Sequence, residues 1–394
     1  MKILYHHRIR SKDGQYVHVE ELTNALLEAG HELVFVGPNA IDNEELGADA
    51  GFVAWMKQHL PQFVYEILEF GYAFLDFLRL ANAIRAHKPD CIYERYNLFL
   101  PSGIWARKLF RLPLLLEVNA PLFAERSKYD GIALKRFAKA TESYTWRGAD
   151  YVLPVTEVLA KIVEDAGVPR DRIRVVPNGI RPDRFARVPA REKAKARLGL
   201  EGKFVLGFAG FVREWHGIDR VLEYLAESGT DDQHLLLVGD GPAKEQLLRK
   251  AQELGLAERF TITGIVDRDD IAAYLAAFDI SLQPAVVAYA SPLKLFEYLY
   301  LGCAIVAPAT ANIREILSDG DNALLFDPGS RKELFECIER CYRDEELRQR
   351  LGDAARDTID QKGLTWARNA TRVIDLFTSL GATTPVPDAQ RGGE

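Results

Sequence analysis

The chain of 394 residues exceeds a single ordinary hydrophobic core and fits two domains of about 200 residues each. Hydrophobic residues make up 48% and charged residues 27% of the sequence, the proportions of a globular protein, and the net charge is −7. No apolar run approaches the roughly 18 residues that cross a bilayer, no apolar signal segment opens the chain, and no large basic field suits a nucleic-acid backbone. We therefore expect a cytoplasmic protein without a nucleic-acid partner.

The N-terminal half predicts alternating strands and helices. An apolar run at 2–7, a turn with glycine, a helical pattern ending at Gly30 and a second apolar run at 32–37 form a βα unit of a parallel sheet. Further strand signals follow at 91–95, 114–119 and 151–155. Loops at the carboxyl ends of such strands build ligand sites, which places the loop 8–15 on a cleft. The absence of a GxGxxG motif argues against a dinucleotide site of the usual type.

Residues 51–87 are rich in aromatic side chains and poor in charge. They predict either helices packed on the sheet or an apolar surface that faces an acceptor or a membrane. Basic clusters at 107–111 and 126–139 lie in the same half. We therefore also consider that the protein contacts the inner face of an anionic membrane peripherally.

A linker near 180–190 separates this half from a second alternation of strands and helices. The predicted strands there are 204–210, 234–238, 259–263, 280–283 and 304–307, with helices between them. One more amphipathic helix at 365–380 precedes a polar tail at 381–394 that we expect to be disordered. The predicted fold class is therefore α/β, with two doubly wound, Rossmann-like domains facing each other across a cleft.

The segment 288–302 combines an apolar helix with two charges. Ser291 is predicted as its N-cap, Pro292 as its first residue and Gly302 as its end. Lys294 and Glu297 share one polar stripe near the helix N-terminus, where free N–H groups favour an anion. This pattern favours a phosphorylated, hydroxyl-bearing ligand, and the alternative is a structural ion pair between residues three apart.

Several segments resemble the retaining glycosyltransferases of family 4, which have the GT-B fold. These are the linker motif at 175–185, the loop at 208–219, and the donor-domain motifs at 237–242, 291–302, 305–308, 315–317 and 320–326. The resemblance implies transfer of a sugar from a UDP- or GDP-linked donor to an acceptor hydroxyl, in the biosynthesis of cell-surface polysaccharides or glycolipids. It also implies an acceptor-side domain at 1–182, on which the helix 365–380 packs, and a donor domain at 190–362.

The resemblance also assigns residues. Arg213 matches a residue that contacts the diphosphate, and Glu297 matches the second acid of a paired motif, which holds the ribose hydroxyls. The cations and the helix N–H groups would stabilise the leaving diphosphate without a metal or other cofactor. The expected catalytic residues are Arg213, Lys294 and Asn119. The expected donor-binding residues are Glu297, Ser291, Leu293, His216, Gly14, Gln15 and Val266.

Three positions depart from the family pattern. Tyr289 stands where the first acid of the paired motif falls, which leaves the donor sugar open. His216 lies in the segment that replaces a second basic residue, and it could serve if the diphosphate protonates it. Asn119 stands in place of a frequent histidine and cannot act as a base. A formal DxD motif at 267–269 precedes a helix and is predicted as an N-cap region rather than a metal site.

Two further hypotheses share this architecture. A nucleotide-sugar 2-epimerase would act on its substrate without an acceptor, and a non-catalytic nucleotide-sugar-binding protein would bind but not react.

Overall fold

The computed structural model describes residues 1–9, 14–37 and 59–382. The chain forms two compact units, and each is described by itself. The first comprises Met1–Pro177 together with the chain from Asn369 onward, and the second comprises Asn178–Arg368.

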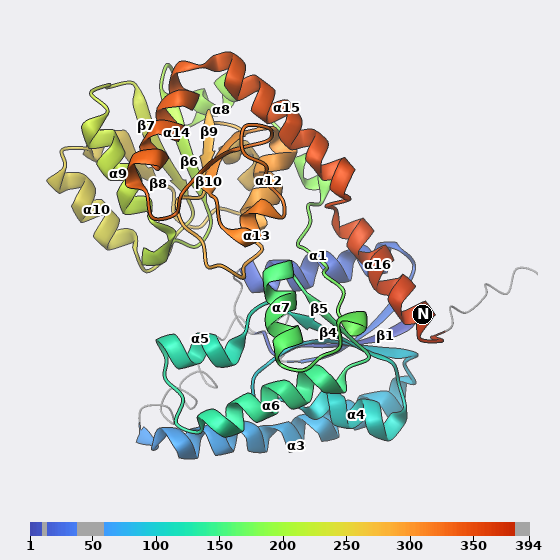
Figure 1. Cartoon of the computed structure of the whole chain (residues 1–394). Coiled ribbons are helices and arrows are strands. Elements are labelled where there is room, and N and C mark those ends of the chain that lie inside the picture. The colour runs from blue at the N-terminus through green and yellow to red at the C-terminus, as the bar shows by residue number, and fades with distance from the viewer. Residues whose placement is uncertain (10–13, 38–58, 383–394) are drawn as a thin grey trace, which may run out of the picture. The chain divides into compact units, whose positions relative to one another are not determined.

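The described part of the first unit contains a five-stranded parallel sheet with the order β2-β1-β3-β4-β5 (Figure 1). Its strands are β1 (Lys2–His6), β2 (Glu32–Val36), β3 (Cys91–Arg95), β4 (Leu114–Val118) and β5 (Tyr151–Pro154). Its helices are α1 (Gly14–Glu28), α3 (Gln62–His87), α4 (Ser102–Phe110), α5 (Leu122–Tyr129), α6 (Lys135–Gly148), α7 (Glu157–Asp165) and α16 (Trp366–Ser379). Strands β3 and β4 are buried along their whole length, as expected where helices cover both faces of a parallel sheet.

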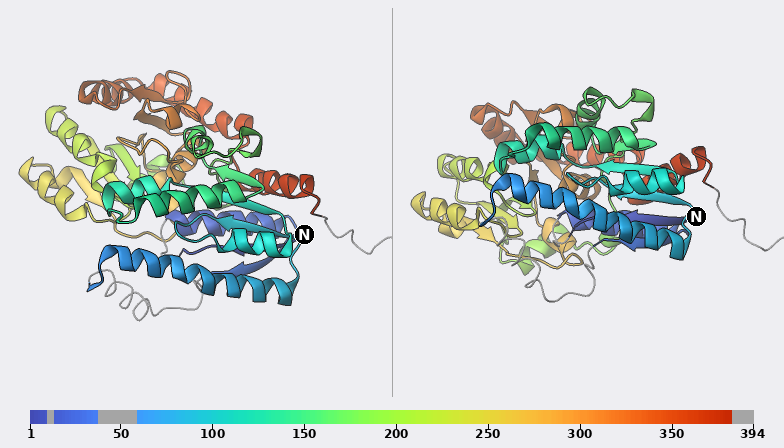
Figure 2. Two further views of the ribbon diagram at one scale, coloured as in Figure 1. Left: turned by 60° about the horizontal axis from the view of Figure 1, so that its bottom comes forward. Right: turned by 90° about the horizontal axis from the view of Figure 1, so that it is seen from below.

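One face of this sheet is covered by α3, α4 and α6, which lie side by side, and α1 lies on the opposite face (Figures 1 and 2). Within the part of the chain that the structure describes, no helix is both long and apolar enough to cross a membrane. The tail predicted at 381–394 lies almost entirely outside the described residues, as do residues 51–58 of the aromatic segment.

The second unit contains a six-stranded parallel sheet, over its described residues, with the order β11-β10-β9-β6-β7-β8. Its strands are β6 (Phe204–Ala209), β7 (Gln233–Val238), β8 (Phe260–Ile262), β9 (Ile280–Leu282), β10 (Ala304–Pro308) and β11 (Leu324–Phe326). Its helices are α8 (Arg191–Arg197), α9 (Ile218–Glu227), α10 (Lys244–Glu253), α11 (Ile271–Leu275), α12 (Leu293–Leu301), α13 (Ala311–Arg314), α14 (Arg331–Arg343) and α15 (Glu345–Lys362). Buried apolar side chains form one core cluster on each face of the sheet.

These two sheets confirm the predicted doubly wound α/β class. In each sheet the strand order reverses direction once, between β1 and β3 in the first unit and between β6 and β9 in the second. Ligands of doubly wound proteins bind beside the carboxyl ends of the strands at such a switch point.

The beginning of helix α12 differs from the prediction made for the segment 288–302. It begins at Leu293, and Pro292 occupies the N-cap position with an extended backbone (ψ 120°) and no side-chain cap. Ser291 is therefore not the N-cap. Its hydroxyl accepts a hydrogen bond from the backbone N–H of Asn178 at 3.3 Å, and its carbonyl accepts one from the Asn178 side chain. Gly302 ends the helix with φ 66°, as predicted.

Candidate functional site

The candidate site of the second unit lies at the switch point between β6 and β9. Strand β6 runs into Gly210 and the loop that carries Arg213 and His216. Strand β9 runs into the loop that ends in α12. Because both strands are parallel, these loops emerge at the same edge of the sheet.

Helix α12 is fixed against the end of β6. The backbone N–H of Ala209 donates a hydrogen bond to the buried Tyr298 hydroxyl at 2.9 Å. Lys294, one turn earlier, then extends along the strand end, with its Nζ 3.7 Å from the centroid of the Phe208 ring. A Cβ at Gly210 would come within 3.3 Å of Lys294 Cε, and Gly210 has a φ of +118° that favours glycine. Glycine at this position therefore leaves room for the lysine.

The surroundings of Lys294 make its charge depend on a ligand. Burial lowers the pKa of Lys294 to about 7, although the nearby Glu297 carboxylate favours the charged form. An anion placed beside the ammonium group would restore its charge, because opposite charges favour ionisation. The lysine is therefore suited to bind a phosphate.

Arg213 is an exposed residue in the loop after β6, and two aromatic rings restrain its side chain. Its guanidinium carbon is 5.1 Å from the centroid of the Phe211 ring and 4.9 Å from that of Trp215. Such cation–π contacts restrain the planar guanidinium group while leaving its N–H groups available at the surface.

His216 completes this loop as a neutral hydrogen-bond donor. Its Nδ1 accepts the backbone N–H of Arg213 at 3.0 Å, which places the remaining proton on Nε2. Burial, together with the positive charges of Lys294 and Arg213, lowers the pKa of His216 to about 3. His216 is therefore neutral without a ligand, and its protonation by a bound diphosphate stays a prediction.

The loop between β9 and α12 is held by hydrogen bonds from a residue of α13. The buried Asn312 side chain donates hydrogen bonds to the carbonyls of Val287 at 3.1 Å and Ala290 at 2.7 Å. Leu293 is the first helical residue after this loop, and Val266 follows β8 and packs against the same core as α12. The structure thus brings Arg213, His216 and Lys294 together, on a framework that includes Ser291 and Leu293.

Two glycines after β7 also allow the loop after β7 to approach the loop after β6 closely. A Cβ at Gly239 would lie 2.3 Å from the Gly210 carbonyl oxygen, and one at Gly241 would lie 2.1 Å from that of Val212. Both have φ values that favour glycine. The close backbone approach lets the N–H of Val212 donate to the Asp240 carbonyl at 2.8 Å, which supports the loop that carries Arg213.

In the first unit, Asn119 follows β4 and is bound to a buried carboxylate. Its side-chain amide donates to Glu117, which also accepts from the Tyr93 hydroxyl at 2.8 Å and pairs with Arg95 at 2.5 Å and His18 at 3.0 Å. Burial would raise the pKa of Glu117, but His18, Arg95 and these hydrogen bonds hold it well below its usual range. The charged hub therefore fixes Asn119 at the carboxyl edge of the sheet.

Glu94 and Arg95 do not pair with each other, because neighbouring residues of a strand point to opposite faces. Glu94 lies 3.3 Å from Nδ1 of His6, its partner across β1 and β3, and Asp76 lies 2.9 Å from Nε2 of that histidine. Burial alone would lower the pKa of His6, but the two carboxylates raise it to about 10. Gly14 and Gln15 begin α1.

Sequence reasoning missed four residues that position the site. They are Gly210, Tyr298, Asn312 and Glu117. Gly210 lies in the family motif at 208–219, and Glu117 lies two residues before Asn119. Their positions therefore offered a weak signal for both. Asn312 and Tyr298 act through contacts with distant segments, which leave no local pattern.

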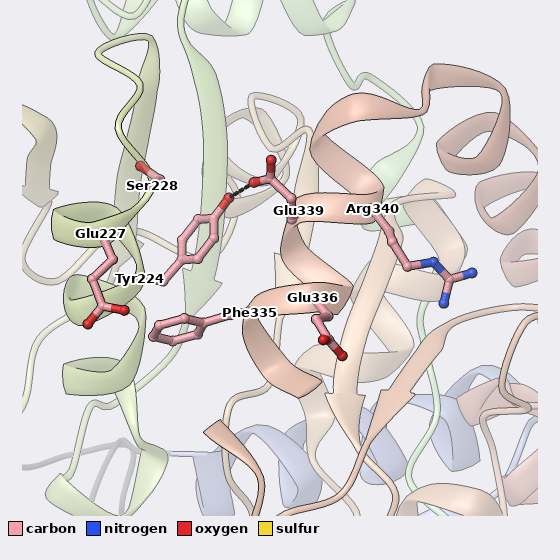
Figure 3. A pocket seen from close by; sticks show the side chains of 7 residues that line it. All are labelled: Tyr224, Glu227, Ser228, Phe335, Glu336, Glu339 and Arg340. Carbon is pink, nitrogen blue, oxygen red and sulfur yellow. Dashed lines mark hydrogen bonds between the residues drawn. The ribbon is translucent and has the colours of Figure 1, made fainter. Parts of the chain in front are cut away.

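Two features lie apart from this site. A shallow pocket of about 580 Å³ lies between α9 and α14, where the Tyr224 hydroxyl donates to Glu339 at 2.9 Å (Figure 3). It adjoins the amino edge of the sheet, since Gln233 at the start of β7 donates to the same tyrosine. The DxD motif at 267–269 precedes α11, and among described residues no group of three or more His, Cys, Asp or Glu could hold a metal.

Both halves of the chain resemble known proteins. Residues 12–184 match the model of Glycosyltransferase Family 4, and residues 190–358 match that of Glycosyl transferases group 1. The crystal structure of Anabaena Alr3699/HepE in complex with UDP has a similar fold, with a TM-score of 0.75 and 20% identity, and covers 96% of this chain and 100% of that one. The glycosyltransferase WaaG, involved in lipopolysaccharide biosynthesis, has a TM-score of 0.66, 17% identity and coverage of 96% and 100%.

Among related sequences, 2-deoxystreptamine glucosyltransferase from Streptomyces kanamyceticus is 32% identical over 256 residues. That match covers 62% of this chain and 65% of the relative, slightly less than two thirds of its length. The lipopolysaccharide core biosynthesis glycosyltransferase LpsE of Rhizobium meliloti (strain 1021) is 28% identical over 242 residues, which are 61% of this chain and 66% of that one.

The two doubly wound sheets place the protein in the GT-B fold class, which the similar structures share. More narrowly, the chain belongs to glycosyltransferase family 4, the group 1 glycosyl transferases.

Proposed function

We propose that this protein transfers a sugar from a nucleoside diphosphate donor to an acceptor hydroxyl with retention of the anomeric configuration. The observation that carries the proposal is the desolvated Lys294 beside Arg213 and His216 at the β6/β9 switch point. A buried lysine with two neighbouring N–H donors fits a diphosphate leaving group. UDP is the first candidate nucleotide, because the similar Alr3699/HepE structure contains it, and GDP is the second.

In the proposed reaction, the bond between the anomeric carbon and the diphosphate oxygen breaks while the acceptor oxygen bonds to the same carbon. The acceptor proton passes to the departing phosphate oxygen, so no protein base is needed and Asn119 can serve by binding the donor sugar. Arg213 and Lys294 stabilise the growing negative charge, and His216 donates from Nε2. Because these groups supply the positive charge, we propose that the reaction needs no metal.

The remaining residues would bind the donor and acceptor. Glu297, on the stripe of Lys294, would accept hydrogen bonds from the ribose hydroxyls. Ser291, Leu293 and Val266 would contact the nucleotide, and Gly14 and Gln15 at the start of α1 would approach the diphosphate. An acceptor in glycan or glycolipid assembly is supported by the lipopolysaccharide core relative, and the 2-deoxystreptamine glucosyltransferase makes an aminocyclitol a further candidate.

A test of the reaction uses UDP-glucose and GDP-mannose, each with and without 2-deoxystreptamine or a lipopolysaccharide core oligosaccharide. Acceptor-dependent release of the nucleoside diphosphate is expected from one donor. Conversion of the nucleotide sugar without an acceptor would instead identify an epimerase. Calorimetric binding of UDP or GDP with no turnover across acceptor classes would favour the non-catalytic alternative.

The Glu297 assignment predicts weaker nucleotide binding after substitution. Glu297→Ala should raise the Kd for UDP by about 5- to 150-fold, or roughly 1–3 kcal/mol, because hydrogen bonds to a charged acceptor are lost. Glu297→Gln keeps one carbonyl acceptor and should lose less. Isothermal titration calorimetry measures both.

The matched control is Glu253→Ala, an exposed carboxylate at the end of α10. It should leave the Kd for UDP unchanged. Unaltered affinity in Glu297→Ala would remove this residue from the nucleotide site.

A further inference from the structure

Helix α3 has its acidic residues turned toward the protein. Glu66 accepts the backbone N–H groups of Ala133 and Leu134 at 2.7 Å, just before α6. Glu69 pairs with Arg126 at 3.0 Å, and Asp76 pairs with His6 at 2.9 Å. All the carboxylates of this helix are therefore engaged by neighbouring elements, which leaves its outer face without negative charge.

That outer face is apolar instead. The side chains that share it are large and about half exposed, between 49% and 58%. They are Ile67, Leu68, Phe74, Leu75 and Leu78. An ordinary surface helix directs such residues toward the core and its carboxylates toward solvent, whereas α3 exposes large apolar side chains and turns its carboxylates inward. Contiguous exposed apolar surface of this kind marks an interaction site.

The neighbouring helices extend this surface. Trp105 of α4 contacts Phe74 with ring centroids 5.0 Å apart, and Leu109, one turn further along α4, is 59% exposed. Phe137 of α6 contacts Phe70 of α3 at 4.9 Å and is itself partly exposed. The three helices lie side by side on one face of the sheet (Figure 2). We call their outward-facing residues the α3 surface.

The exposed charges within these three helices are all positive. Helix α4 contains no acidic residue, and the single one in α6, Glu142, is buried. The exposed basic residues of α3, α4 and α6 are Arg79, Arg85, Lys108, Lys135, Arg136, Lys139 and Arg147. An apolar stripe bordered by cations is the pattern of a helix that lies in the interface of an anionic membrane.

We propose that the α3 surface docks this protein on an anionic lipid bilayer, with Leu75 and Leu78 entering the headgroup region and the flanking Lys and Arg residues binding lipid phosphates. A second copy of the chain is a poorer occupant, because two such surfaces would meet with like charges. An acidic protein would satisfy the cations but would not require the unbroken apolar stripe. The proposal is independent of the sugar-transfer reaction.

Co-sedimentation with vesicles tests the proposal. The full chain should bind phosphatidylcholine vesicles that contain about 30% phosphatidylglycerol, and bind phosphatidylcholine alone at least about tenfold less, because the cations select anionic lipid. Leu75→Glu combined with Leu78→Glu should lower binding to the anionic vesicles at least about tenfold, since it places carboxylates where the chain meets the headgroups.

A charge variant separates the two contributions. Lys135→Gln, Arg136→Gln and Lys139→Gln together should remove most of the preference for anionic vesicles while the apolar stripe remains. Matched controls are Leu254→Glu, at an exposed leucine on the second unit, and Lys193→Gln with Arg197→Gln and Arg249→Gln, at exposed bases of that unit. Both should bind like the native chain, and unchanged UDP affinity in all variants shows that the nucleotide site is intact.

Three results would overturn the proposal. The native chain could fail to bind anionic vesicles at low salt, or the Leu75/Leu78 variant could bind them as the native chain does. Capture of polyglutamate in preference to the vesicles would assign the α3 surface to an acidic protein partner.

Discussion

Replacing Lys294 with methionine is expected to reduce the turnover number by about 10²- to 10³-fold. The ammonium group, which lies over the Phe208 ring, would meet the charge that grows on the diphosphate as the sugar departs. Methionine keeps the length and packing of the chain but removes that charge. The effect on kcat should exceed the effect on the Kd for UDP, because the charge is larger in the transition state. Steady-state kinetics and calorimetry provide the two numbers.

The lowered pKa of Lys294 also predicts how nucleotide binding depends on pH. Its pKa of about 7 in the free protein means that the lysine is charged below this pH and increasingly neutral above it. A diphosphate favours the charged form, so UDP should bind with proton uptake above pH 7, and its affinity should fall as the pH rises. The Lys294→Met variant should lose this slope.

The control for both measurements is Lys161→Met, at an exposed lysine of α7. Its kinetics and its pH profile should match those of the native protein. A Lys294→Met variant with nearly native kcat, or with an unaltered pH slope, would contradict the role assigned to this lysine.

Glu117→Ala is expected to give the largest loss of stability, about 3–5 kcal/mol. The substitution leaves the buried Arg95 without its carboxylate partner and removes acceptors from His18 and Tyr93. Chemical denaturation followed by tryptophan fluorescence measures the change. Because Asn119 loses its anchor, transfer should also slow at temperatures where the variant remains folded.

Glu157→Ala provides the comparison for Glu117. Its carboxylate pairs with Arg170 at 2.9 Å on the surface, where both side chains are about half exposed. The loss there should stay within about 1 kcal/mol, because solvent screens exposed ion pairs. Equal losses in the two variants would show that the Glu117 hub contributes no more than a surface pair.

The stability of the native protein and that of Glu117→Ala should also depend differently on pH. The pKa of Glu117 is held below its usual range in the folded protein. Its contribution is therefore present above the pKa of an unfolded glutamate, about 4.3, and is lost as the pH falls below that value. Acid unfolding of Glu117→Ala should begin from a lower stability and show a shallower slope.

Much of the fold was predictable from local pattern. The apolar runs before Arg95, Val118 and Ala209 correspond to strands of the two sheets, because a strand buried on both faces needs a continuous apolar segment. The end of α12 at Gly302 followed from the conformational freedom of glycine. Its beginning differs by one residue, since the Pro292 backbone is extended, and Ser291 hydrogen-bonds Asn178 outside the helix.

The resemblance to a family pointed to Arg213, Lys294 and Asn119, but it did not indicate what holds them. The Glu117 hub joins residues 18, 93, 95 and 119, which come from α1, β3 and the end of β4. Their meeting depends on the strand order and register rather than on any short motif. For the aromatic segment, sequence allowed a packed helix or an interaction surface. Helix α3 packs on the sheet and also leaves Leu75 and Leu78 exposed, on which the proposed interaction surface rests.

The sequence by itself determined the two doubly wound halves, the apolar character of α12 and its polar stripe of Lys294 and Glu297. These features follow from the periodic burial of side chains within one element, which neighbouring residues encode. Only the tertiary structure decided that Lys294 lies over Phe208 and beside Gly210, that His216 is neutral and that the carboxylates of α3 turn inward. Such contacts join segments that are far apart along the chain, so their environment, and with it their charge, exists only once the sheets have formed.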